Sequence, residues 1–155
     1  MPGLLIIAHA PLASSLKTVA QHAFPDCARR LEAFDVPADM APEDIEAGVR
    51  TLLALVRNPD ALILTDVFGA TPCNVSQRVA SQFNGTAGAQ VKAIAGVNVP
   101  MLWRALSYPD DSLDMLVARA MAGATQGIIQ LASSRPQNQA QKTGAHDQDP
   151  HQHQQ

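Results

Sequence analysis

Residues 4–16 read LLIIAHAPLASSL, a run of large aliphatic side chains that ends at His9 and passes almost at once into a helix-like segment. An uninterrupted apolar run of this kind is typical of a parallel strand that is covered on both faces. A buried strand has no need of a histidine, the side chain whose charge changes near neutral pH. The stretch therefore predicts an α/β fold with a central first strand, and it places His9 where that strand ends.

The rest of the chain repeats this alternation of strand-length apolar runs and helix-length amphipathic segments. Such alternation predicts a doubly wound, mostly parallel sheet with helices on both faces. If the second strand lies on one side of the first and the third strand on the other, the strand order is 2-1-3-4. We expect strands over residues 3–8, 31–36, 61–66 and 90–97, helices over 12–24, 72–83 and 100–106 and from 42 and 110 onward, and a short fifth strand over 128–132.

The composition is that of one globular domain with a polar end. With 155 residues and 46% hydrophobic side chains the chain can bury its own core, and its net charge of -3 offers no basic surface for nucleic acid. No apolar run approaches the length of a membrane span, and the start lacks a signal peptide's basic flank, so we expect a cytoplasmic protein that is not inserted in a membrane. Residues 133–155 contain no large apolar side chain. They predict a disordered tail after a folded domain over 1–132.

Two polar side chains follow strands that the expected order makes neighbours. His9 ends the first strand, and Asp66 ends the third. In open parallel sheets ligands lie beyond the carboxyl ends of the strands, at the point where the strand order reverses. A carboxylate that holds one ring nitrogen as N–H leaves the lone pair of the other nitrogen free to attack. His9 is therefore the candidate nucleophile, and Asp66 is the residue that orients it.

The residues after Asp66 predict an anion site. Residues 69–72 read GATP, in which Thr71 is expected to cap a helix and Pro72 to be its first residue. Unpaired amides at such a helix start favour negative charge, and the helix after His9 offers a second positive end. An anion site beside a nucleophilic histidine predicts phosphoryl transfer through a phosphohistidine. We expect no metal ion or other cofactor, because no acidic cluster for magnesium accompanies the site. Cys27 and Cys73 are expected to be reduced thiols.

Three motifs, LLIIAHAPLASSL, LILTDVFGATPCN and AIAGVNVPML, carry a family resemblance in their order and spacing. They resemble the mannose-type enzyme IIA domain of the bacterial phosphoenolpyruvate-dependent sugar phosphotransferase system, over residues 3–132. The resemblance implies the strand order 2-1-3-4 and a last, antiparallel strand that is exchanged across a homodimer. It also implies roles for single residues: phosphoryl acceptor on Nε2 for His9, its partner for Asp66, the phosphate-binding loop for Gly69, Ala70 and Thr71, and a place at the rim for Asn98.

The function that the resemblance implies is that of a phosphotransferase component that acts as a phosphocarrier. The resemblance implies that the histidine phosphocarrier protein HPr donates the phosphoryl group. Either a separate IIB protein then accepts this group, or the phosphorylation state of the chain acts on a regulatory partner. The chain departs from the family pattern at three positions, where glycine, tryptophan and glycine are frequent: Ala10, Phe68 and Ala70.

Two other functions remain open on the sequence alone. In a receiver-like signalling module Asp66 would itself be phosphorylated, but receivers need acidic residues after the first strand for magnesium, and this chain has AHA there. In a non-covalent regulatory module the crevice would bind a small anion without forming a bond. The stability of the phosphorylated product in acid and alkali separates the first alternative from a phosphohistidine carrier.

Overall fold

The computed structural model describes residues 1–84 and 88–132, apart from the side chains of residues 27–29. All four longer strands are confirmed, with ends within two residues of the predicted ones. A 3-10 helix between the first helix and the second strand was not predicted. The elements are β1 (Gly3–His9), α1 (Leu12–Ala23), η1 (Pro25–Arg30), β2 (Leu31–Val36), α2 (Pro42–Val56), β3 (Ala61–Thr65), α3 (Thr71–Phe83), β4 (Val91–Ala95), α4 (Val99–Ser107) and α5 (Leu113–Gln126).

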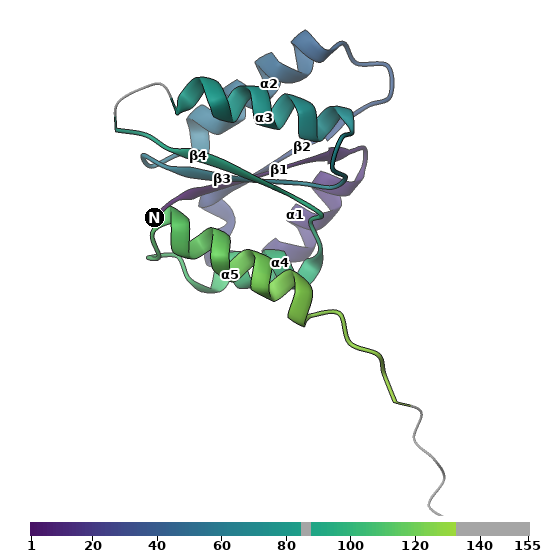
Figure 1. Ribbon diagram of the computed structural model, residues 1–155, viewed down its shortest axis with the longest axis vertical. Coiled ribbons are helices and arrows are strands. Elements are labelled where there is room, and N and C mark those ends of the chain that lie inside the picture. The colour runs from purple at the N-terminus through teal and green to yellow at the C-terminus, as the bar shows by residue number, and fades with distance from the viewer. Residues whose placement is uncertain (85–87, 133–155) are drawn as a thin grey trace, which may run out of the picture.

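The four strands form one parallel sheet in the order β2-β1-β3-β4, which confirms the predicted topology. β1 and β3 are its central strands, and Leu4 of β1 lies opposite Leu31 on one side and Leu62 on the other. Figure 1 shows α2 and α3 over one face of the sheet and α1, α4 and α5 over the other. Because all strands run the same way, the carboxyl ends of β1 and β3 meet at one edge.

Both faces of β1 are buried, which explains why its sequence does not alternate. Leu4 and Ile6 pack into a cluster with α1, α4 and α5, whereas Leu5 and Ile7 pack into a second cluster with α2 and α3. All four side chains are fully buried. The two clusters hold β1 between them, so the residue that follows Ala8 is presented at a fixed position at the edge of the sheet.

The predicted fifth strand is not formed within this single chain. Residues 128–132 adopt no regular secondary structure, and Ile128, Ile129 and Leu131 are 77%, 72% and 87% exposed. A short strand needs a neighbour to satisfy its backbone, and β4, the edge strand, has no second partner in the described part of the single chain. The predicted disordered tail, residues 133–155, lies outside the described residues.

Two loops at the carboxyl edge of the sheet are tied to each other. The backbone N–H of Gly96 donates to the C=O of Asp66 at 2.8 Å, and the N–H of Val97 donates to the C=O of Thr65 at 2.9 Å. These bonds fix the segment that follows β4 against the end of β3. None of the helices in the described ranges is long and apolar enough to cross a bilayer.

Candidate active site

His9 and Asp66 lie in contact, although 57 positions separate them in the sequence. The Nδ1 atom of the ring is 2.7 Å from Oδ2 of Asp66, and the same oxygen accepts the backbone N–H of His9 at 2.9 Å. The contact follows from the topology, because β1 and β3 are adjacent and His9 and Asp66 stand at their ends. One carboxylate oxygen thus fixes both the main chain and the ring of the histidine.

The environment of Asp66 keeps its carboxyl group ionised. Its side chain is only 9% exposed, and this burial by itself raises the pKa. The hydrogen bonds from the backbone and the ring of His9, together with that from the N–H of Val67 at 2.8 Å, outweigh the burial. The pKa of Asp66 is therefore below its ordinary value of 3.8.

An ionised Asp66 decides which nitrogen of His9 is reactive. A carboxylate can only accept hydrogen bonds, so Nδ1 of the ring must carry the proton that Oδ2 receives. The lone pair of a neutral ring is then on Nε2. The side chain of His9 is 53% exposed, so an incoming group can reach it. The pair thus presents Nε2 as the nucleophile, while Asp66 holds the ring through Nδ1.

Helix α3, whose start was predicted to form the anion site, begins one residue earlier than predicted. Ala70 is the N-cap residue, with an extended backbone, and its C=O accepts the N–H of Asn74 at 3.0 Å. Thr71 is therefore the first helical residue instead of the cap; a proline's fixed φ also suits a position later in the first turn. No side chain caps α3, and among the described residues the amides of Thr71 and Cys73 have no hydrogen-bond acceptor.

The start of helix α1, the predicted second positive end, has a carboxylate beside it. Its N-cap residue, Pro11, has no side chain that could accept a hydrogen bond. Instead the Oδ1 atom of Asp35, on β2, accepts the N–H of Ser14 at 3.0 Å. The sequence analysis missed Asp35, and the signal that could have found it is a charged residue near the end of a strand that pairs with β1.

Asn98 lies after β4, at the edge of the sheet where the resemblance places it. Its side-chain oxygen accepts the N–H of Met101 at 2.9 Å, and its amide nitrogen donates to the C=O of Ala124 at 3.2 Å. Asn98 therefore caps α4 and ties this helix to α5. Both ends of its amide group are occupied by the protein.

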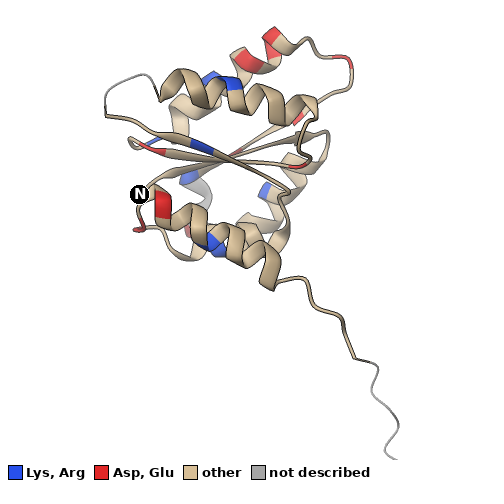
Figure 2. Cartoon of the chain, in the orientation of Figure 1, with Lys and Arg blue, Asp and Glu red and all other residues tan. Residues whose placement is uncertain are grey.

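The carboxyl edge of the sheet carries apolar side chains and no cation. The loops that follow β1, β3 and β4, residues 10–11, 66–70 and 96–98, contain neither lysine nor arginine (Figure 2). Four large apolar side chains at this edge are 39% to 79% exposed, and we refer to them as the apolar collar: Leu12, Val67, Phe68 and Val99. These loops therefore offer an anion no lysine or arginine side chain. What they offer is the backbone amides at the helix start.

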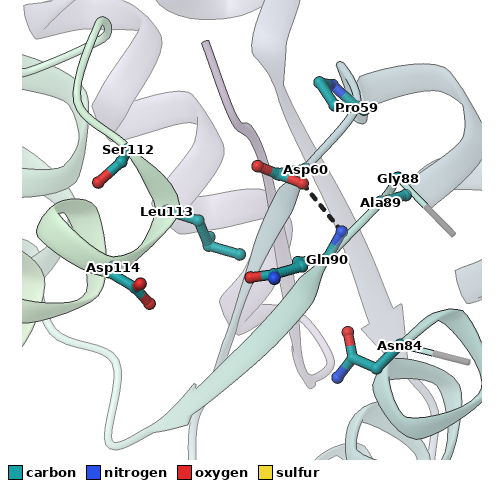
Figure 3. A pocket seen from close by; sticks show the side chains of 9 residues that line it. All are labelled: Pro59, Asp60, Asn84, Gly88, Ala89, Gln90, Ser112, Leu113 and Asp114. Carbon is teal, nitrogen blue, oxygen red and sulfur yellow. Dashed lines mark hydrogen bonds between the residues drawn. The ribbon is translucent and has the colours of Figure 1, made fainter.

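A hollow of about 520 Å³ lies at the opposite, amino end of the sheet (Figure 3). Its carboxylates are already engaged, because Asp60 accepts the N–H of Gln90 at 2.9 Å and Asp114 pairs with Lys92. Neither histidine nor cysteine lines it. Within the described ranges, no group of three or more histidine, cysteine, aspartate and glutamate side chains is placed to hold a metal ion. This hollow therefore has no nucleophilic nitrogen of the kind that His9 presents at the carboxyl edge.

Gly69 gives the loop before α3 its shape, and its replacement by alanine is predicted to cost about 1–2 kcal/mol of folding free energy. Its φ is +84°, and an added Cβ would meet no atom within 4 Å, so the cost comes from the backbone alone. Gly88→Ala is the matched control, because Gly88 has a φ of +91° with equally open surroundings at the other end of the sheet. Urea unfolding should show similar losses, and only Gly69→Ala should slow phosphorylation. Equal phosphorylation rates would contradict a role of this loop in binding.

The fold and the site together describe a doubly wound α/β domain with a carboxylate-held histidine beside free helix amides. Residues 3–121 match the family model described as the PTS system fructose IIA component. The mannose-specific EIIAB component of Escherichia coli K12 is 34% identical over 98 residues, which cover 62% of this chain and 29% of that protein. The match thus spans less than a third of the length of this relative.

Solved structures show the same fold. The mannose/sorbose specific IIA subunit from Enterococcus faecalis superimposes with a TM-score of 0.76 at 21% identity, over 86% of this chain and 97% of that one. Component EIIA from Streptococcus agalactiae gives a TM-score of 0.72 at 21% identity, over 84% and 97%. The chain belongs to the IIA component family of the sugar phosphotransferase system, and membership assigns it a phosphocarrier role.

Proposed function

We propose that the chain accepts a phosphoryl group from HPr on Nε2 of His9 and passes it to a separate IIB protein, or uses its phosphorylation state to act on a regulatory partner, in the cytoplasm. The observation that carries the proposal is the 2.7 Å contact between Nδ1 of His9 and Oδ2 of Asp66. This contact leaves the lone pair on Nε2, in a side chain that is 53% exposed. Family membership supplies the phosphotransferase context.

The transfer is a displacement in which one P–N bond replaces another. The lone pair of Nε2 attacks the phosphorus, a new P–N bond forms, and the P–N bond to the donor's imidazole breaks with its electron pair returning to that ring. The proton on Nδ1 of His9 stays in place, and the positive charge that develops on the ring is stabilised by Asp66. The loop at Gly69, Ala70 and Thr71 is proposed to bind the phosphoryl oxygens through its amides.

The surface around His9 suits a phosphocarrier partner. The apolar collar offers side chains that a docking protein can cover, and covering them excludes water from the reacting phosphorus. The three loops at the edge provide no cation. HPr is therefore proposed to cover the collar and to contribute any positive charge that screens the phosphoryl group during transfer.

A second copy of the chain is the partner proposed for residues 128–132. Ile128, Ile129 and Leu131 are exposed, and the β4 edge of the sheet is unpaired in the described part of the single chain. Exchange of this segment between two copies would give the β4 edge of each copy a neighbouring strand. Light scattering should find a dimer for the full chain and a monomer for a chain that ends at Gly127. A full chain that is monomeric at micromolar concentration would contradict the exchange.

The decisive experiment incubates the chain with phosphoenolpyruvate, enzyme I and HPr and measures its intact mass. The expected result is the gain of one phosphoryl group that is lost in acid and retained in alkali. An acyl phosphate on Asp66, the receiver-like alternative, would instead be lost in alkali and to hydroxylamine. A chain that stays unmodified while a control carrier is phosphorylated would overturn the proposal and favour a module that binds anions without a covalent step.

A further inference from the structure

Asp35 acts on helix α1 from a neighbouring strand. It lies opposite Ala8 in the pairing of β2 with β1, so its carboxyl group stands beside the end of the strand that carries His9. Its Oδ1 atom accepts the N–H of Ser14, the third residue of α1, at 3.0 Å. A capping side chain normally accepts the N–H of the second or third helical residue, and the cap residue Pro11 cannot do so. Asp35 replaces that missing cap.

The same segment is held at two further points. The N–H of Ala10 donates to the C=O of Val36 on β2 at 3.1 Å, and the N–H of His9 donates to Asp66 at 2.9 Å. The connection between β1 and α1 is only two residues long. Among the described residues, Asp35 is therefore the charged side chain that holds the start of α1 from the β2 side, three residues after the end of the strand that carries His9.

The two helices that begin near His9 differ in their electrostatics. The positive end of α1 meets the carboxylate of Asp35, which compensates it and repels a second anion. The positive end of α3 meets no side chain, because its cap residue is Ala70. The amides of Leu12 and Ala13 in α1, like those of Thr71 and Cys73 in α3, have no acceptor among the described residues, so the two helix starts differ in the negative charge at α1 and not in their free amides.

We propose that Asp35 is a positioning residue: by capping α1 with a carboxylate, it keeps phosphate oxygens away from that helix and directs them to the amides at the start of α3. The inference rests on the proposed function in so far as the anion is the phosphoryl group of His9. Asp35 itself contacts neither the ring nor, in this arrangement, the transferred group. Its effect passes through the helix that it caps.

The test compares Asp35→Asn with Asp39→Asn by amide NMR during a titration with inorganic phosphate. The asparagine keeps a side-chain oxygen for the N–H of Ser14 and loses only the charge. Asp39 is an exposed carboxylate four residues further on, so its replacement is matched in charge. In the wild type and in Asp39→Asn we expect shifts at Thr71 and Cys73 but not in the first turn of α1.

In Asp35→Asn we expect shifts in the first turn of α1 as well, with phosphate bound about two- to fivefold more tightly. Asp35→Ala, which also loses the cap, should melt at a lower temperature, whereas Asp35→Asn should melt close to the wild type. A purely structural role would give no new phosphate response in Asp35→Asn. That result, or a response of the α1 amides already in the wild type, overturns the inference.

A covalent experiment separates this inference from the proposed function. After phosphorylation by HPr, the phosphohistidine of Asp35→Asn should persist about two- to fivefold longer than that of the wild type and of Asp39→Asn. Equal lifetimes with equal phosphate responses would remove the inference and leave the phosphocarrier function standing. A wild type that takes no phosphoryl group would remove the function, while the phosphate titration would still decide the role of Asp35.

Discussion

Replacing His9 with alanine will abolish phosphorylation of the chain by HPr, because Nε2 of this ring is the proposed acceptor. The fold should survive, since the side chain of His9 is 53% exposed and both core clusters are built from other residues. Intact mass after incubation with phosphoenolpyruvate, enzyme I and HPr measures the loss, and circular dichroism measures the fold.

His22→Ala is the matched control for this experiment. His22 is an exposed histidine near the end of α1, away from the edge that carries His9, and the variant should be phosphorylated like the wild type. Phosphorylation that persists in His9→Ala would show that another residue is the acceptor, and it would contradict the assignment of His9 as the phosphoryl acceptor.

Replacing Asp66 with asparagine is expected to slow phosphoryl transfer by about 10²-fold or more. An asparagine can occupy the same space but has no negative charge to stabilise the ring as positive charge develops, and its amide group can hold the ring in the wrong tautomer. Asp60→Asn is the control, because Asp60 lies just before the same strand at its other end. Rapid-quench measurement of the transfer rate should show a loss only in Asp66→Asn; equal rates would contradict the orienting role.

The same variant should change how stability depends on pH. The folded pKa of Asp66 is lowered, so its contribution to stability is full above the ordinary value of 3.8 and is lost as the pH falls through the lower folded value. Urea unfolding at about pH 7 should therefore separate wild type from Asp66→Asn, and the gap should narrow toward about pH 3. A gap that widens on acidification would mean that the carboxyl group is not held ionised by His9 and Val67.

The sheet could be predicted from the sequence because its strands are marked by composition. β1 and β3 are continuous apolar runs, which only a doubly covered parallel strand explains, and each is followed at once by a helix signal. The strand order was assumed on the basis of that pattern and was also implied by the family resemblance, and with it His9 and Asp66 fall at one edge. The pairing of these two residues was predictable because it follows from topology and needs no side-chain detail.

The features that were missed depend on register and backbone angles. Asp35 reaches Ser14 only because β2 is aligned with β1 at Ala8, and no local pattern reveals that alignment. The start of α3 was placed one residue late because threonine is a frequent cap, whereas the extended backbone of Ala70 takes that place. The strand expected over residues 128–132 has no partner within one chain, so its sequence preference alone cannot form it.

The tie that Asn98 makes between α4 and α5 bears on where the chain leads after its last helix. Because this side chain follows β4 and donates to the C=O of Ala124, the end of α5 is held at the carboxyl edge of the sheet. A protein tethered to this end of α5 by a linker would meet His9 at millimolar effective concentration instead of by free diffusion. The contacts of one amide group thus place the end of the last helix beside the edge that carries His9.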